Sequence, residues 1–195
     1  GRSFEPVRYT AMHYRHVERG ARKMPAGAWM RPEYYGAAHS RADNIAAEVV
    51  SVRENVGMID VSTLGGLEIR GPDAAEFLNR MYTFAYLKQP IGRARYVLMT
   101  DESGVIVDDG VACRMHDDHF YVTATTSGVD GVYRTMLWYN VQWRLKVDIT
   151  HVSGSYAGVN IAGPNSREVL QKLCDDVDLS PEAFPYMGAR RGTVA

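Results

Sequence analysis

The sequence lacks the features that mark several large classes of protein. Only two of its 195 residues are cysteine, Cys113 and Cys174, which is too few for a disulfide framework in a domain of this size. No leading apolar run has the length of a signal peptide, and no apolar stretch is long enough to cross a bilayer. These absences predict a reducing, cytoplasmic location and no membrane partner.

Strong charge and phosphate-binding loops are also missing. The formal net charge is −1, and the basic residues are scattered, which argues against a nucleic-acid partner because phosphate binding needs clustered Lys and Arg. Neither a GxGxxG motif nor a Walker lysine is present, so nucleotide binding within this chain is not expected. What remains is an ordinary globular composition, 46% hydrophobic and 23% charged. The chain does not begin with Met, and we expect it to be a piece of a longer protein.

Residues 1–41 show little apolar periodicity but several aromatic side chains, including Trp29, Tyr34 and Tyr35. We predict an irregular arm that packs over the main domain or a partner through these rings. Three histidines, His13, His16 and His39, raise the question of a metal site. No compact Cys or carboxylate partner completes a ligand set at metal-site spacing, so no metal is predicted.

Residues 42–195 alternate between helical and strand patterns. Apolar residues from Ile45 to Val56 fall at helical spacing, and Gly57 supplies a stop. Further helices are predicted from residue 73 to 81 and from 129 to 139. Strands are predicted at 58–62, 66–70, 96–100, 105–111, 120–125, 146–151 and 156–162. The pattern indicates an α+β fold with mixed or antiparallel sheets and packed helices.

One unit of the pattern occurs twice. Residues 67–81 align without gaps on residues 159–173, and both stretches read as a strand, a Gly-Pro turn and a helix. A single repetition is too little for a solenoid, so two related α+β halves are the better interpretation. The alternative is that strand-to-helix turns favour Gly-Pro for local reasons.

Two adjacent aspartates stand in a valine-rich hairpin, and Asp109 is the candidate functional residue. Strand alternation places Asp109 on a face with Val105, Val107, Val111 and Cys113, whereas Asp108 points to the other face. With a four-residue turn at 101–104, Tyr96 lies opposite Asp109, and Thr125 of the next strand extends the row. A ring face, a carboxylate and a hydroxyl suit a flat, nitrogen-rich heterocycle.

Three other interpretations of the hairpin stay open at this point. A buried Asp is usually held by backbone N–H groups or an arginine for structural reasons. A divalent metal on Asp101, Asp108 and Asp109 is disfavoured, because adjacent aspartates on opposite faces do not ligate one ion without a bulge. Cys113 on a valine-rich strand is most simply a core residue rather than a nucleophile.

Four segments of the sequence resemble a known family. They are Val56–Gly65, Gly71–Arg80, Gly104–Val111 and Ala162–Leu170. Together they resemble the aminomethyltransferase, or glycine-cleavage T-protein, family, and most closely its version at the C-terminal end of the alpha subunit of heterotetrameric sarcosine oxidase. The resemblance runs from about Ala42 to the end, which makes residues 42–195 the N-terminal part of an aminomethyltransferase-like folate-binding domain. Residues 1–41 then resemble the joint to an upstream domain.

The resemblance implies a tetrahydrofolate-binding site. Its catalytic residue is Asp109, and its cofactor-binding residues are Leu64, Tyr96, Thr123 and Thr125. The implied activity is capture of the one-carbon unit from sarcosine oxidation as 5,10-methylenetetrahydrofolate. The other oxidase subunits are the implied partners, and flavin and NAD belong to the rest of the complex.

The sequence departs from the family at two of these positions. The family often has Asn where this chain has Thr125, and His-Met where it has Thr63-Leu64. The second half of the family's fold lies beyond Ala195, so the isolated fragment is expected to be inactive. A stand-alone aminomethyltransferase, a dimethylglycine-dehydrogenase-like protein and a non-catalytic assembly module are the alternatives.

Overall fold

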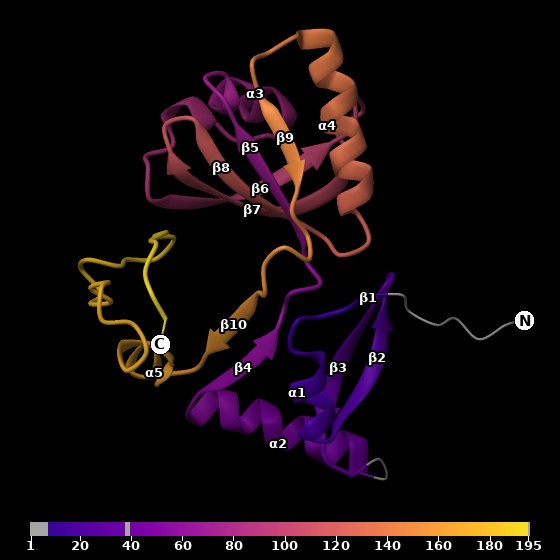
Figure 1. Cartoon of the computed structure of the whole chain (residues 1–195), viewed down its shortest axis with the longest axis vertical. Coiled ribbons are helices and arrows are strands. Elements are labelled where there is room, and N and C mark those ends of the chain that lie inside the picture. The colour runs from indigo at the N-terminus through magenta and orange to yellow at the C-terminus, as the bar shows by residue number, and fades with distance from the viewer. Residues whose placement is uncertain (1–7, 38–39, 195) are drawn as a thin grey trace, which may run out of the picture. The chain divides into compact units, whose positions relative to one another are not determined.

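The computed structural model describes residues 8–37 and 40–194, and the chain divides into two compact units (Figure 1). The first unit draws on Gly1–Thr63, Gly154–Asp175 and Val194–Ala195. The second unit consists of Leu64–Ser153 and Asp176–Thr193. Each unit is therefore assembled from segments that are far apart in the sequence.

The first unit contains two small sheets and three helices among its described residues. Its elements are β1 (Arg8–Tyr9), α1 (His13–Glu18), β2 (Ala21–Ala26), β3 (Trp29–Tyr35), α2 (Arg41–Glu54), β4 (Gly57–Asp60), β10 (Val159–Ala162) and α5 (Ser166–Gln171). One sheet has the order β1-β3-β2, and in the other β10 pairs antiparallel with β4. The predicted helix after Ala42 is confirmed as α2, although it begins at Arg41 and ends at Glu54.

The expectation of an irregular arm in residues 1–41 is wrong for the described part of that segment. Strand β3 pairs with β2 in an antiparallel hairpin and with β1 in parallel, and Trp29 and Tyr34 are buried. Prolines hid these strands from sequence reasoning, because proline cannot donate to a sheet ladder. Pro32 lies beside a register shift in the β2–β3 pairing, which is where a proline is tolerated in a sheet.

His16 links three elements of the first unit through a buried polar network. Its Nε2 lies 2.8 Å from Oδ2 of Asp60 on β4, and its Nδ1 lies 2.7 Å from the hydroxyl of Tyr35 on β3. This histidine is therefore a structural residue that ties α1 to both sheets. No group of three potential metal ligands occurs among the residues that are described, and His39 lies outside them.

The second unit is built on a five-stranded antiparallel sheet. Its elements are β5 (Gly65–Arg70), α3 (Ala74–Met81), the short 3-10 helix η2 (Tyr86–Lys88), β6 (Arg93–Thr100), β7 (Ile106–His116), β8 (His119–Ala124), α4 (Val129–Trp143) and β9 (Asp148–His151). The strand order is β6-β7-β8-β5-β9. The predicted hairpin, third strand and following helix are confirmed as β6–β7, β8 and α4.

One face of this sheet, the core face, packs against α3 and α4 (Figure 1). The core includes Leu67, Ile69, Val97, Met99, Ala112, Val122 and Ala124 of the sheet together with Phe77, Leu78, Val132 and Met136 of the helices. Burying each large apolar side chain contributes about 1.5–3 kcal/mol. The opposite side, the outer face, carries the residues that alternate with these along the strands.

The repeated Gly-Pro motif adopts the same geometry in both units. Gly71 follows β5 with φ +133°, and Gly163 follows β10 with φ +115°. A Cβ on Gly71 would lie 2.3 Å from the carbonyl oxygen of Lys146, and one on Gly163 would lie 2.4 Å from that of Asn55. Each glycine carbonyl then accepts a hydrogen bond from the first residue of the following helix, Ala74 or Ser166. The two related strand-Gly-Pro-helix units are thus present in the structure.

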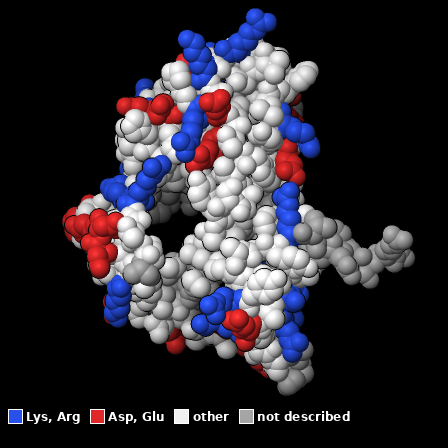
Figure 2. Space-filling model, viewed as in Figure 1, with Lys and Arg blue, Asp and Glu red and all other residues white. Residues whose placement is uncertain are grey.

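The surface has no dominant charge. Lys and Arg side chains alternate with Asp and Glu over the face seen in Figure 2, in keeping with the formal net charge of −1. Within the described part of the chain, none of the helices is both long enough and apolar enough to span a membrane.

Candidate functional site

The β6–β7 hairpin has a different register from the one that the sequence predicts. Residues 101–105 form the turn, Thr100 pairs with Ile106, and a register shift follows before Met99 pairs with Asp108. Asp101 stabilises this turn, because its Oδ1 accepts hydrogen bonds from the N–H groups of Ser103 (2.9 Å) and Val105 (3.0 Å). The longer turn and the bulge at Val107 together move the pairing by two residues.

Tyr96 consequently does not lie opposite Asp109. Asp109 pairs with Leu98, and Tyr96 pairs with Val111. The prediction of direct pairing is wrong, but a shift of two residues preserves the face. Tyr96 and Asp109 are therefore diagonal neighbours on the outer face, still within reach of one aromatic ligand.

The two aspartates have the opposite burial to the one expected. Asp109 is exposed on the outer face, and Asp108 is only 6% exposed on the core face. The valine-rich side of β7 looked like the core side in the sequence, yet Val105 and Val107 are exposed. Helices α3 and α4 decide which face is buried, and the pattern of one strand does not contain that information.

Asp108 holds the backbone on which Asp109 stands. Its Oδ1 accepts hydrogen bonds from the N–H of Asp109 (2.8 Å) and from the N–H of Thr125 (3.2 Å). Its Oδ2 lies close to Gly128, the residue directly before α4 begins at Val129. A Cβ added to Gly128 would lie 2.3 Å from this oxygen. A carboxylate is favourable there because the N-terminus of a helix carries partial positive charge. Oδ2 has no hydrogen-bond partner among residues 8–37 and 40–194.

The carboxylate of Asp109, in contrast, makes no hydrogen bond or ion pair with any residue that the structure describes. Its neighbours on the outer face are apolar or aromatic, with Leu98 directly opposite and Tyr96 diagonal to it. Tyr96 is 66% exposed, so its ring is accessible. An ionised carboxylate accepts hydrogen bonds only, and this one is available to a ligand.

Tyr186 is a neighbour of this surface that sequence reasoning missed. A hydrogen bond with Tyr96 raises the pKa of the Tyr186 hydroxyl. The segment containing Tyr186 is held along β6, where the N–H of Ala94 donates to the carbonyl oxygen of Met187 at 2.8 Å. No spacing signal predicts this contact, because Tyr186 is far from the hairpin in the sequence and lies outside any helix or strand.

The hydroxyl groups of Thr123 and Thr125 hydrogen-bond to the backbone. The Oγ1 of Thr123 accepts a hydrogen bond from the N–H of Val111 at 2.9 Å. The Oγ1 of Thr125 accepts one from the N–H of Gly128 at 3.1 Å. The predicted row of Tyr96, Asp109 and Thr125 is wrong at its first pair, because Asp109 lies opposite Leu98 and not Tyr96. The backbone N–H of Thr125 donates to the carboxylate of Asp108. The pairing of Cys113 with Tyr121, on which that row was based, is confirmed.

Leu64 and Cys113 complete the set of predicted residues. Leu64 is 43% exposed and precedes Gly65, whose partner Ala124 is followed by Thr125, so Leu64 lies at the same end of β8. Burial raises the pKa of the Cys113 thiol, which makes it a poor nucleophile. The three aspartates considered as metal ligands lie in different places. Asp101 stabilises the turn, Asp108 lies at the start of α4, and Asp109 lies on the outer face, so their carboxylates do not converge on one point.

The site as a whole offers one free carboxylate beside an exposed aromatic ring. Such a pair can stabilise positive charge on a ligand nitrogen and take up its proton, while the ring covers a flat group. The chemistry that the geometry allows is therefore electrostatic and acid–base.

The sequence of the chain is similar to that of known proteins. Residues 12–195 match the family described as GCVT N-terminal domain. The chain is 43% identical over 190 residues to sarcosine oxidase subunit alpha of Corynebacterium sp. (strain U-96), covering 96% of this chain and 20% of that protein. It is 32% identical over 187 residues to the aminomethyltransferase of Thermotoga neapolitana, covering 95% of this chain and 48% of that protein. The chain thus spans about a fifth of the first relative and about half of the second.

Solved structures agree on the fold. Glycine cleavage system aminomethyltransferase T from Bartonella henselae superposes with a TM-score of 0.77 at 19% identity, covering 85% of this chain and 43% of that chain. Heterotetrameric sarcosine oxidase from Corynebacterium sp. U-96, in complex with pyrrole 2-carboxylate, superposes with a TM-score of 0.55 at 19% identity, covering 76% of this chain and 72% of that chain. The architecture is α+β with the aminomethyltransferase T-protein fold, and because the family match extends over residues 12–195, the chain belongs to the GCVT N-terminal domain family.

Proposed function

We propose that this chain is the front part of a tetrahydrofolate-binding domain in a sarcosine oxidase alpha subunit. The domain captures the one-carbon unit of sarcosine as 5,10-methylenetetrahydrofolate. The 43% identity with a sarcosine oxidase alpha subunit supports this assignment over a stand-alone aminomethyltransferase. Partners are then the other subunits of the oxidase, whose flavin and NAD lie outside this chain. A cytoplasmic location is part of the proposal and fits the two free cysteines.

The observation that carries the proposal is the free carboxylate of Asp109 next to the exposed ring of Tyr96. A reduced pterin with its aminobenzoyl group presents flat rings and N–H donors. The Tyr96 ring is accessible for stacking, and an ionised carboxylate accepts N–H hydrogen bonds. The residues present therefore fit the ligand, and the exposed side chains of Leu64 and Leu98 add apolar contact.

When bound, tetrahydrofolate supplies the two amine nitrogens that bond to the one-carbon unit, with one water released from formaldehyde. Asp109 would stabilise positive charge on a bound ligand nitrogen and would accept its proton, which would pass to the oxygen that leaves as water. Preorganised charge of this kind lowers the activation barrier by about 3 kcal/mol in a site that excludes water. Asp108 is a positioning residue, because it fixes the Asp109 N–H.

The first prediction tests Asp109 in the full-length protein with sarcosine and tetrahydrofolate. Asp109→Asn keeps the shape of the side chain and removes its charge. We expect the yield of methylenetetrahydrofolate to fall about 100-fold, whereas sarcosine consumption continues and free formaldehyde accumulates. The matched control is Asp175→Asn, an exposed aspartate of the first unit, which should leave all three quantities unchanged. An Asp109→Asn protein with a normal folate-product yield would overturn the assignment.

A further inference from the structure

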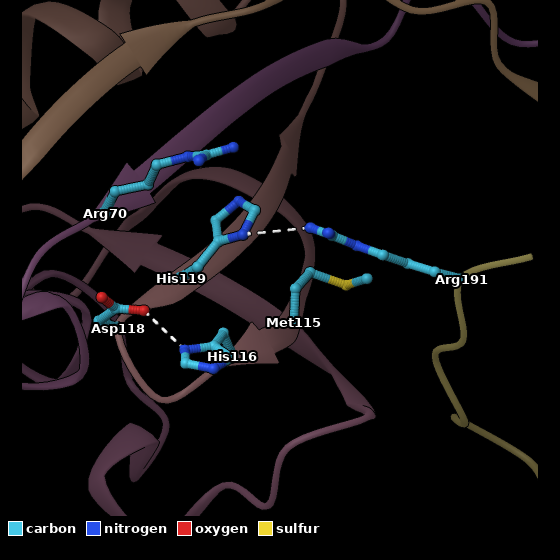
Figure 3. Close-up of a pocket in the computed structure, with 6 residues that line it drawn as sticks. All are labelled: Arg70, Met115, His116, Asp118, His119 and Arg191. Carbon is cyan, nitrogen blue, oxygen red and sulfur yellow. Dashed lines mark hydrogen bonds and ion pairs between the residues drawn. The ribbon is translucent and has the colours of Figure 1, made fainter.

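A cavity of about 310 Å³ lies in the second unit, at the other end of the sheet from Asp109. It is lined by Arg70, Met115, His116, Asp118, His119 and Arg191 (Figure 3). Arg70 ends β5, Met115 and His116 end β7, His119 begins β8, and Arg191 comes from the segment after α5. Met115 lies six positions after Asp109 along β7, which corresponds to about 20 Å along a strand. The cavity is therefore distinct from the surface around Asp109.

The charged groups of the cavity are paired except for one. Arg70 contacts the carboxylate of Glu68 at 2.7 Å. Asp118 accepts a hydrogen bond from His116 Nδ1 at 2.9 Å. Arg191 has no carboxylate within ion-pair distance among the described residues, and its guanidinium instead lies 3.4 Å from Nδ1 of His119. Figure 3 shows Arg70 and Arg191 on two sides of the His119 ring.

His119 does not neutralise that guanidinium. Burial lowers the pKa of the His119 imidazole, and the positive charges of Arg70 and Arg191 lower it further against the opposing effect of Glu68. The ring is only 7% exposed, and its Nε2 has no hydrogen-bond partner in the described chain, with the nearest carboxylate oxygen, on Glu68, at 3.5 Å. The cavity thus has a neutral buried donor and an unpaired guanidinium facing the same space.

We propose that this cavity binds the oxyanion of a small ligand, a phosphate or carboxylate group, between Arg191 and Arg70. A guanidinium presents parallel N–H donors that match two oxygens of such a group, and pairs of this kind are among the stronger hydrogen bonds in proteins. His116 and His119 supply further N–H donors, and Met115 forms the apolar floor. The volume lies at the lower end of the range typical of small-molecule sites.

The proposal predicts that the anion binds more tightly as the pH falls. The groups that face the bound anion are Arg70 and Glu68 on β5, His116 and Asp118 at the β7–β8 turn, His119 on β8, and Arg191. The hydrogen bond from His116 lowers the pKa of the Asp118 carboxyl, so this group stays ionised as the pH falls through the range in which histidines titrate. Burial and the two arginines lower the pKa of His119, and its protonation as the pH falls adds positive charge around the anion.

The test is titration calorimetry of the full-length protein with inorganic phosphate and, separately, with succinate at constant ionic strength. We expect saturable binding, at least tenfold weaker in Arg191→Gln. The control is Arg134→Gln on the exposed surface of α4, which removes the same charge elsewhere and should change Kd less than twofold. Tighter binding of phosphate assigns a phosphate-bearing ligand, and tighter binding of succinate assigns a carboxylate.

A second variant tests the proposal in case Arg191→Gln does not fold. The side chain of His116 is 71% exposed, so His116→Gln should fold normally and, by removing one N–H donor, weaken binding about threefold. Absence of saturable binding of either anion to the wild-type protein would overturn the proposal. So would equal weakening by Arg191→Gln and Arg134→Gln, because the effect would then be one of net charge alone.

Discussion

At the scale of single residues, Asp108 and Asp109 differ in what their carboxylates contact, and this predicts that only substitutions of Asp108 lower the stability. Asp108→Asn places an amide NH₂ beside the positive end of α4 and removes the favourable charge there, at a cost of about 1 kcal/mol. Asp108→Ala also strips the N–H of Asp109 and the N–H of Thr125 of their acceptor, so we expect about 2–3 kcal/mol. Thermal unfolding measures both losses.

Asp109→Asn is the control for this prediction. Its carboxylate has no hydrogen bond within the described residues, so neutralising it should leave the Tm within about 1 °C. For a chain of this size, 1 kcal/mol corresponds to about 2–4 °C. Equal shifts for Asp108→Asn and Asp109→Asn would show that Asp108 has no special structural role.

At the scale of elements, the hairpin shows how far strand periodicity predicts a site. Alternation correctly separated Asp108 from Asp109, and it kept Tyr96 on the face of Asp109, because those conclusions depend only on even and odd positions. The partner of Asp109 and the buried face depend on the length of the turn, the bulge at Val107 and the packing of α3 and α4. The alternation of apolar and polar residues along β6 and β7 specifies none of these three features.

The Gly-Pro turn leads to a prediction at the same scale. Gly71→Ala introduces a Cβ at φ +133° and 2.3 Å from the Lys146 carbonyl oxygen, a backbone atom that cannot move freely. The backbone strain costs about 1–3 kcal/mol, and the clash adds to it. We expect the Tm of Gly71→Ala to fall by at least 5 °C.

Gly104→Ala separates these two contributions. Gly104 also has a positive φ, +86°, but its Cβ would meet no atom within 4 Å. Its loss should be about 1 kcal/mol, from backbone strain alone. If Gly71→Ala is no less stable than Gly104→Ala, the close approach at the strand-Gly-Pro-helix turn is not a constraint on the fold.

At the scale of the whole molecule, the sequence predicted the α+β class and most elements of residues 42–195, because long periodic segments and Gly-Pro turns are local signals. It missed the sheet formed by β1, β2 and β3, where Pro25 and Pro32 interrupt the strand pattern. It also missed the contact of Tyr186 with Tyr96. Contacts of that kind join segments that are distant in the sequence, and periodicity carries no information about them.

The buried carboxyl of Asp60, which contacts His16 from a distant part of the sequence, makes the first unit sensitive to acid. Burial alone would raise the pKa of the Asp60 carboxyl, which is 3% exposed, but hydrogen bonds from Ser62 and His16 outweigh it and hold the pKa below its usual value. A depressed carboxyl pKa contributes stability above the pKa of the unfolded chain, about 4, and this contribution is lost as the pH falls through the folded value.

Asp60→Asn should therefore lower the Tm by several degrees at pH 7, since a hydrogen bond to a charged group contributes about 1.5–3 kcal/mol. The difference from the wild type should shrink as the pH is lowered from 5 to 3, because the wild-type carboxyl then becomes protonated as well. Calorimetric scans of both proteins across this range measure the difference. A difference in Tm that stays constant with pH would mean that the ionised form of Asp60 is not what joins α1 to β4 through His16.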